Sequence, residues 1–547
     1  MNIRVDPAAR GTGRPDLFAN PLVWLAVIGL VYAPMLFGAF QSDDFNLLDS
    51  IRSDGPLSVW TWRSSFLRPL ASLLLFAQGA LGGWKPAAFH ATSLALHACG
   101  AWLLVRNAAR LRERTGAGPR VVWPIGAIAF ALLPSHLEPV CWISCQADLL
   151  AAVLGLASLD LLLRRPEGSG LRVHAAWITC AALAMLSKES VVALPAILLL
   201  AEAWIAPRSR ASLARVALAC ALLLVGYALV RRACLGEWVA GYGHGSMAHP
   251  RVAVVLANLA LFPLRTLFAP VALGPGWESM AGARAADFHR LFEGTSARVV
   301  LILAAAAGLA ALWVWRARWI GLPASLRFAF AGFALACLPV LTLRVSLVDS
   351  QGERLLYFPG MFLCLALGEL LQPLLRRRAV AVAGLAVVFV AALTLVRGQS
   401  SWTSAQHLAT DLVDATARHV GAAPGDSLVV LNLPDNLRGA YVLRNGLHHG
   451  IRLRQGIDPS RVVGPLTVSS ILDPGDTIHV ARVGDLVRIE LRGRGRRFLD
   501  ANESGLALGR WAGVPTGGAD SPRREIAGLE SVPMLWYSDG RLRPLAP

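Results

Sequence analysis

The sequence predicts an α-helical polytopic membrane protein with a smaller α/β or α+β domain outside the bilayer at its C-terminus. Of its 547 residues, 55% are hydrophobic and only 16% are charged, and the mean hydropathy of +0.52 is high for a soluble globular protein. Apolar runs close to the roughly 20 residues that cross a bilayer recur from Pro21 to about Val396 and then stop. Residues 398–547 instead contain turns, charges and short alternating apolar segments, which are typical of a domain folded in water.

Residues 1–20 are predicted to lie in the cytoplasm. The arginines form short clusters between apolar runs, which is the positive-inside pattern of membrane proteins, and the cluster from Arg106 to Arg120 is the strongest of these signals. The net charge of +17 therefore reflects membrane topology, and without a recognised nucleic-acid-binding module it predicts no nucleic acid partner. Because no small-residue cleavage site follows the first apolar run, we expect a retained span rather than a signal peptide.

Residues 21–397 are predicted to form a membrane domain of about 11 spans with an outer loop at 41–85. Trp60, Trp62 and Trp84 in that loop indicate helices that lie in the membrane interface. The predicted spans are Pro21–Phe40, Pro86–Val105, Val121–Leu133, a fourth that ends before Arg164, Val173–Leu186, Val191–Ile205, a seventh that ends near Val230, and 298–315, 323–341, 355–373 and 379–396.

The stretch 253–273 has two interpretations. Pro263 and Arg265 interrupt it, and a crossing there would place the three arginines at 376–378 outside. We therefore expect an interfacial or re-entrant segment, which leaves the domain 398–547 extracytoplasmic. The alternative is a twelfth crossing and a cytoplasmic tail.

The C-terminal domain is predicted to mix helix and strand. We expect an amphipathic helix at Ser401–Val420, a strand at Ser427–Leu433, a helix at Leu437–Leu447, and several β segments at Arg461–Arg497 with a turn at residues 474–476. None of the eight cysteines lies in this domain, so it is expected to have no disulfide.

An acidic pair, Asp43 and Asp44, directly follows the first apolar run at the predicted outer face. The pair could simply cap the helix that follows it. Two neighbouring carboxylates can also act as a general base or hold a divalent cation, because like charges raise one pKa while the other group stays ionised. Nothing in a purely structural anchor requires two acids there.

Further motifs follow the acidic pair in order along the chain. They are Phe66-Leu67-Arg68-Pro69-Leu70, Phe89-His90, Leu94, Leu96-His97, His136-Leu137-Glu138-Pro139-Val140, Trp142-Ile143, Asp148-Leu149-Leu150, Ser187-Lys188-Glu189 and Glu353-Arg354-Leu355-Leu356-Tyr357-Phe358-Pro359. Over residues 20–400 this series resembles the GT-C superfamily of multispanning glycosyltransferases, particularly the membrane half of transmembrane O-mannosyltransferases with tetratricopeptide tails and their bacterial relatives. The resemblance implies a GT-C-like fold and a polyprenyl-phosphate-sugar-dependent glycosyltransferase.

By this resemblance, catalysis falls on Asp43 and Asp44, and a second outer-loop acid matches Glu138, beside His136. Some members of the family bind metal at these acids, so the resemblance implies a divalent ion held by Asp43, Asp44 and Glu138. The sequence departs from the family at Leu133, where relatives usually have a histidine, and this puts the metal site in doubt. It also lacks a tetratricopeptide tail, which leaves the acceptor open among protein, lipid and glycan.

Four cations near predicted outer span ends are candidates for binding the phosphate of a lipid-linked donor: Arg68, Lys188, Arg344 and Arg354. A guanidinium offers a bidentate fork for phosphate oxygens, and charged residues at span mouths often bind substrate.

The same residues also have structural interpretations. Arg68 could anchor an interfacial helix to lipid headgroups, and Arg354 could pair with its neighbour Glu353. Lys188 could likewise pair with its neighbour Glu189 and so bridge two spans. His90 and His97, two turns apart on one helical face, more often bond to neighbouring spans than bind a metal.

These residues predict transfer of a sugar, such as mannose or another hexose, from a polyprenyl-phosphate donor to an acceptor hydroxyl on the outer face of a bacterial inner membrane. Asp44 would accept the proton of the acceptor while Arg68, Lys188 and Arg354 stabilise the departing lipid phosphate in an inverting displacement. The alternative is a lipid or saccharide transporter or flippase, which would need polar residues or broken helices at mid-span. An inactive envelope-assembly scaffold is a third interpretation.

Overall fold

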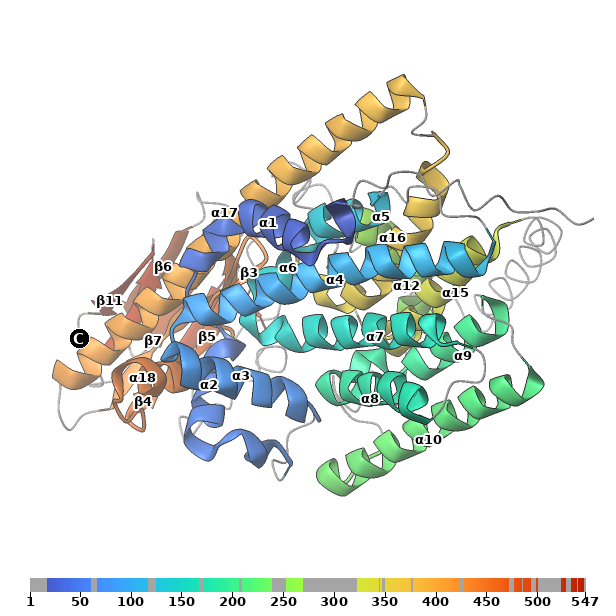
Figure 1. Cartoon of the computed structure of the whole chain (residues 1–547). Coiled ribbons are helices and arrows are strands. Elements are labelled where there is room, and N and C mark those ends of the chain that lie inside the picture. The colour runs from blue at the N-terminus through green and yellow to red at the C-terminus, as the bar shows by residue number, and fades with distance from the viewer. Residues whose placement is uncertain are drawn as a thin grey trace, which may run out of the picture.

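The structure is a computed structural model, and it describes residues 17–60, 66–116, 124–166, 171–205, 209–238, 252–268, 322–343, 345–346, 350–374, 377–422, 427–471, 477–484, 486–492, 498–499, 523–527, 533–538 and 540–545. Figure 1 shows a bundle of helices with a strand-containing domain, formed by the last part of the chain, at one end. The predicted span 298–315, Arg344 and the turn at 474–476 lie outside the described residues.

The helical bundle contains the following elements in chain order. They are α1 (Pro21–Val31), α2 (Asp43–Asp54), α3 (Pro69–Gly82), α4 (Pro86–Arg114), α5 (Ile125–Leu132), α6 (Leu137–Cys141), α7 (Gln146–Arg164), α8 (Leu171–Ser187), α9 (Leu194–Trp204), α10 (Arg210–Leu235), α12 (Val252–Leu267), α15 (Ala324–Cys337), α16 (Tyr357–Leu371) and the first half of α17 (Arg378–Ala422). Short 3-10 turns join several of them: η4 (Pro134–His136), η5 (Ile143–Cys145), η6 (Glu189–Val191) and η9 (Glu353–Leu356).

Five of the described helical stretches are long and apolar enough to cross a membrane: Pro86–Arg114, Ile143–Arg164, Arg210–Leu235, Glu353–Leu371 and Arg378–Gly421. Shorter apolar helices are Pro21–Val31, Pro69–Gly82, Arg172–Ser187 and Ala324–Val340. The expected multispanning helical class is therefore confirmed, while the number of about 11 spans stays a prediction.

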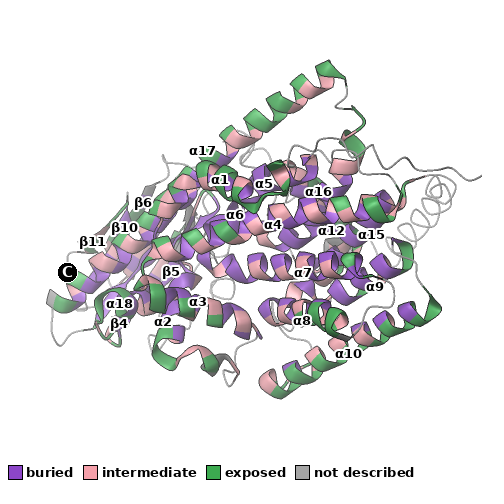
Figure 2. Cartoon of the chain, in the orientation of Figure 1, coloured by how far each residue is buried: buried purple, intermediate pink, exposed green. Residues whose placement is uncertain are grey.

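The centre of the bundle is formed by α4, α7 and α16, which are largely buried in Figure 2. Small residues allow helices to approach closely there: a side chain on Gly126 of α5 would overlap the carbonyl of Cys364 on α16. In contrast, α10 and the first half of α17 expose apolar side chains such as Leu222 and Phe389. Such apolar surfaces are suited to contact with the hydrocarbon core of a bilayer.

The helices α5 and α12 overlap two of the predicted membrane segments. Among the described residues of the predicted span Val121–Leu133, the helix is α5, which ends at Leu132 because Leu133 is extended and Pro134 follows. In α12, the Asn258 amide binds the carbonyls of Leu341 and Leu343, and Arg265 binds that of Ser346. These contacts keep this half of α12 beside Leu341, Leu343 and Ser346, while the interfacial or re-entrant placement of 253–273 stays a prediction.

The C-terminal domain contains α18 (Leu447–Gln455), the end of α17 and eleven described strands in three sheets. The strands are β1 (Leu428–Val430), β2 (Asn432–Leu437), β3 (Ala440–Tyr441), β4 (Val462–Val463), β5 (Thr467–Ile471), β6 (Thr477–Val483), β7 (Leu486–Arg492), β8 (Phe498–Leu499), β9 (Arg523–Ala527), β10 (Met534–Ser538) and β11 (Arg541–Leu545). Their orders are β11-β10-β1-β4, β3-β2-β5-β8 and β6-β7-β9. Parallel pairs β1–β10, β1–β4 and β2–β5 occur beside antiparallel ones, so the predicted mixture of helix and strand is confirmed.

Two predictions for this domain are wrong in detail. The predicted helix Leu437–Leu447 is a strand end, a turn, the short strand β3 and a loop, because Gly439 and Gly446 adopt positive φ and the helix begins only after Gly446. The last predicted span and the following amphipathic helix are one continuous helix, α17. Gly398 lies between the two and is tolerated inside it.

Candidate active site

Asp44 lies in the first turn of α2, directly after the first outer turn of the chain. Its side chain is fully buried, and its carboxylate accepts hydrogen bonds from the backbone N–H of Ser144 at 2.8 Å, from that of Gln41 at 3.2 Å and from the Ser144 hydroxyl. Burial raises the pKa of Asp44 to about 7, and the hydrogen bonds oppose this rise. Asp43 is only half-buried. Of the predicted pair, Asp44 is thus the carboxyl that can exchange a proton near neutral pH.

Glu138 in α6 and Arg354 in η9 form an ion pair near this position. One oxygen of Glu138 accepts from the Arg354 guanidinium and the other from its backbone N–H at 2.8 Å. The Glu138 side chain is fully buried, whereas that of Arg354 is 18% exposed and lies 5.3 Å from the centre of the Trp142 ring. Burial raises the pKa of Glu138, and Arg354 opposes this rise.

Lys188 and Glu189 each form an ion pair with a residue of another segment, and the charge of Lys188 also acts on Glu189. Lys188 binds Asp148 at 2.8 Å, with both side chains at most 3% exposed, and Arg68 holds Glu189 with two nitrogen donors. Lys188 is extended, so its side chain and that of the next residue point to opposite sides. Burial raises the pKa of Glu189, but Arg68 and Lys188 outweigh it and lower this pKa to about 2.

Glu353 likewise pairs elsewhere than with its neighbour Arg354. Its partner is Arg265 of α12, at 3.2 Å, and both side chains are buried. Successive residues of a 3-10 turn point about 120° apart, so Glu353 faces α12 while Arg354 faces α6. The sequence had marked Arg265 only as an interruption of an apolar run.

Cys145 lies close to both of the buried ion pairs, Glu138–Arg354 and Asp148–Lys188. Its thiol lies within electrostatic reach of both Glu138 and Arg354 and of both Asp148 and Lys188. The preceding residue is Ser144, which binds Asp44. The segment η5 therefore brings the buried carboxylate of α2 and two carboxylate–cation pairs to one place.

The histidines lie in the helical core. His136 places Nδ1 2.7 Å from the carbonyl of Phe130, and its ring packs against His97 and Tyr357 at centroid distances of 5.6 and 5.0 Å. His97 Nδ1 lies 2.9 Å from the Tyr357 hydroxyl, as expected for a histidine that bonds to a neighbouring span. His90 is buried in α4 as well. His136 thus does not extend the acidic site at Glu138.

A metal-binding arrangement is absent from the part of the chain that the structure describes: no three His, Cys, Asp or Glu side chains gather there in a suitable group. Both oxygens of Glu138 are taken by Arg354, and both of Asp44 accept protein donors. The residues Asp43, Asp44 and Glu138 therefore do not fit a divalent ion in this arrangement. A metal requirement stays a prediction of the resemblance.

The C-terminal domain lies directly on this site. The Tyr441 ring packs on Trp142 at a centroid distance of 4.6 Å and lies within reach of Glu138 and Arg354. From α17, Gln406 accepts from the N–H of Ala39 at 3.2 Å and donates to the carbonyl of Cys141 at 2.9 Å. One side chain thus joins the helix that enters the domain to both acidic loops.

Comparisons with known proteins place this geometry in context. No family model and no curated protein matches the chain. Among solved structures, the chain is similar to ArnT from Cupriavidus metallidurans in the apo state, with a TM-score of 0.37 and 18% identity over 81% of this chain and 85% of that one. This TM-score is too low to assign an activity or a site to this chain.

Several residues of the site were missed by the sequence analysis: Ser144, Cys145, Gln406 and Tyr441. Ser144 and Cys145 fall between two recognised motifs, so their position was a usable signal. Gln406 and Tyr441 lie in segments whose contacts with the outer loops span hundreds of residues, and no local pattern marks them.

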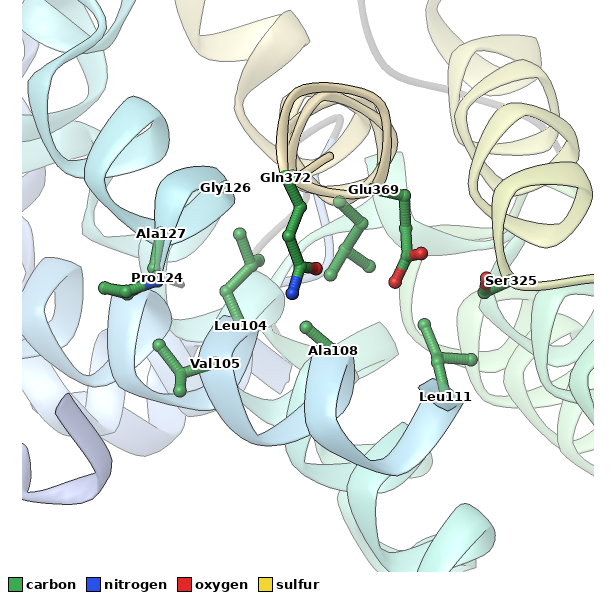
Figure 3. A pocket seen from close by; sticks show the side chains of 12 residues that line it. Leu104, Val105, Ala108, Leu111, Pro124, Gly126, Ala127, Ser325, Glu369 and Gln372 are labelled. Carbon is green, nitrogen blue, oxygen red and sulfur yellow. The ribbon is translucent and has the colours of Figure 1, made fainter. Parts of the chain in front are cut away.

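A separate pocket lies between α4, α5 and α16, where Figure 3 shows Leu104, Ala108, Glu369 and Gln372 among its lining side chains. On α4, the pocket residue Leu104 lies roughly 20 Å along the helix from Phe89. The ring of Phe89 contacts Phe40, which belongs to the first outer turn beside the acidic pair. The pocket is therefore not part of the carboxylate site.

Proposed function

We propose that the chain transfers a sugar from a polyprenyl-phosphate carrier to an acceptor hydroxyl at the outer face of a membrane, with inversion at the anomeric carbon. The observation that supports this most is the buried Asp44 carboxyl, with a pKa of about 7, beside the Glu138–Arg354 ion pair. A general base works best when its pKa lies near the working pH.

The polytopic architecture suits a lipid-linked donor. An isoprenoid chain can stay in hydrocarbon among apolar helices while its phosphosugar meets polar groups where these helices end. The buried carboxylates and their cations lie in the first turns of α2, α6 and α7, just before α3, at the start of η6 and in η9, all at helix ends. A transporter would instead need such groups at mid-span.

In the proposed reaction, Asp44 takes the proton of the acceptor hydroxyl. The acceptor oxygen then bonds to the anomeric carbon as the bond from that carbon to the phosphate oxygen breaks, and polyprenyl phosphate leaves. Arg354 and Arg68 are partly exposed, at 18% and 21% of their side chains, and contact the leaving phosphate. A guanidinium has five N–H donors, enough for a carboxylate and a phosphate together. Lys188, at 2% exposure, adds positive charge from behind Asp148.

Gln41 is a candidate for binding the sugar. Its side chain is fully buried and one turn before Asp44, and neither amide atom has a hydrogen-bond partner among the described residues. A buried amide without partners costs about 1–3 kcal/mol per group. A sugar hydroxyl, which both donates and accepts, would satisfy it.

The test is transfer of label from a radiolabelled polyprenyl-phosphate hexose in membranes that contain equal amounts of wild type, Asp44→Asn or Asp54→Asn. Asp54 lies on the same helix but is exposed, so it is a matched control. Loss of the base should lower turnover about 10²- to 10⁴-fold, whereas the exposed change should alter it about two-fold at most. A parallel arm with a chelator tests the metal prediction.

Equal transfer by wild type and Asp44→Asn would remove Asp44 from the mechanism. If wild type transfers no label but moves the labelled lipid across sealed vesicles, the flippase interpretation replaces the transferase.

A further inference from the structure

The residue before the acidic pair has an unusual backbone conformation. Ser42 has φ 45° and ψ −119°, a region that residues with a Cβ rarely adopt. Such a conformation costs free energy and persists only where surrounding contacts impose it. Because α2 begins at the next residue, the conformation of Ser42 fixes the direction in which Asp44 enters the site.

The contacts that impose it come from the C-terminal domain. The N–H of Ser42 donates to the carbonyl of Val442 at 2.9 Å, and its hydroxyl donates to the Asn445 side-chain oxygen at 3.3 Å. Gly446, with φ 90°, lies directly against the Ser42 carbonyl, and an added Cβ there would overlap that oxygen and lie 3.2 Å from Cβ of Phe45. Residues 442–446 therefore surround Ser42 on its backbone and side-chain faces.

A second set of contacts holds the same domain on α2. The buried Asp49 accepts from Arg452 and lies 2.8 Å from Nδ1 of His449, both on α18. Gly450 of α18 packs against the Phe45 ring. These contacts fix α18, and with it the segment 442–446 that precedes it, relative to the acidic turn.

We propose that residues 442–446 of the C-terminal domain are a positioning element for Asp44: by holding Ser42 in its left-handed conformation, they keep the Asp44 carboxyl against Ser144. This rests on the proposed function in so far as Asp44 is the base. Sugar transfer then requires the C-terminal domain to be seated on the first outer turn.

The decisive variant is Gly446→Ala in the full-length protein, with Gly456→Ala as its matched control. Both glycines flank α18 and both have positive φ, so alanine strains the backbone at each. Only Gly446 touches Ser42, because nothing lies within 4 Å of a Cβ at Gly456. Asn445→Ala, which removes one bond to Ser42 without any steric clash, serves as a milder second variant.

The measurement is kcat and KM for sugar transfer, together with the rate at which a water-soluble carbodiimide labels Asp44, read from its peptide by mass spectrometry. We expect Gly446→Ala to lower kcat about 100-fold, as for a misplaced reacting group, with little change in donor KM, and to speed Asp44 labelling. Gly456→Ala should leave kcat, KM and labelling near those of wild type.

Equal losses in both glycine variants, or wild-type turnover in Gly446→Ala, would overturn the proposal. If wild type itself transfers no sugar, the proposed function fails and labelling decides the inference alone. Faster labelling in Gly446→Ala but not in Gly456→Ala would still support it, and unchanged labelling in both would refute it.

Discussion

Ser144 sets the protonation of Asp44 from a loop that is 100 residues away in the chain. Its N–H and hydroxyl both bind the buried carboxylate, and both lower a pKa that burial raises to about 7. The two opposing effects leave Asp44 able to accept a proton in the neutral range. Asp43, one residue earlier, raises this pKa slightly by its charge.

The first prediction concerns pH. A base must be unprotonated, so kcat/KM of wild type should rise with pH through a midpoint near 7, the pKa of Asp44 in the free protein. Ser144→Ala removes a hydrogen bond that lowers the pKa of Asp44, so the rising limb should move to higher pH. Initial rates measured between pH 5 and 9 check this, and a limb that stays in place in Ser144→Ala would show that another group titrates.

At the residue scale, the sequence predicts charged groups for the site but not their partners. The family resemblance gives Asp44 and Glu138, and position at predicted span ends gives Lys188 and Arg354; their roles stay predictions. Adjacent charges do not reveal these partners, which are 40 residues apart for Lys188 with Asp148 and 216 for Arg354 with Glu138. Only helix packing decides which side chains meet over such separations.

Among the elements, α17 connects the two halves of the molecule. Its first half exposes apolar side chains, and its second half packs into the C-terminal domain beside both acidic loops. The predicted separation between the span 379–396 and the helix Ser401–Val420 does not occur, because the one glycine between them, Gly398, lowers helix stability by only about 1 kcal/mol. A rigid helix therefore passes from the membrane domain into the domain that covers the site.

Gln406→Leu tests this connection. The leucine removes the partner of the Ala39 N–H and of the Cys141 carbonyl, and each buried group left unpaired costs about 1–3 kcal/mol. We expect a lower thermal unfolding midpoint and lower turnover, measured in detergent and in membranes. His407→Gln, at the next, exposed position of α17, is the control. Equal stability of both variants would contradict the role given to Gln406.

At the scale of the whole molecule, the sequence predicts only on which side of the membrane the C-terminal domain lies. Charge clusters predict an extracytoplasmic domain, and this orientation stays a prediction, while the domain itself docks on α2 beside the acidic loops. The docking surface itself could not be predicted, since Asp49 and Arg452 are 403 residues apart. Neither charge patterning nor periodicity reports on contacts of that separation.

The Asp49 contact predicts an asymmetry between two variants. Arg452→Ala leaves the buried Asp49 without its charged partner, whereas Asp49→Asn leaves Arg452, whose side chain is 50% exposed, to be solvated by water. The arginine variant should weaken docking more, by about 1.5–3 kcal/mol. Protease cleavage rates of the C-terminal domain measure this. Arg454→Ala, which breaks a pair with Asp414 on the partly exposed side of α18, should have little effect.

The measurement that tests the central claim most directly is the product of purified wild-type protein in liposomes with a polyprenyl-phosphate hexose of one defined anomer and a simple acceptor alcohol. We predict a glycoside of the opposite anomeric configuration by NMR, and none from Asp44→Asn in the same liposomes. A product with retained configuration, or equal product from the Asp44→Asn variant, would contradict direct displacement with Asp44 as the base.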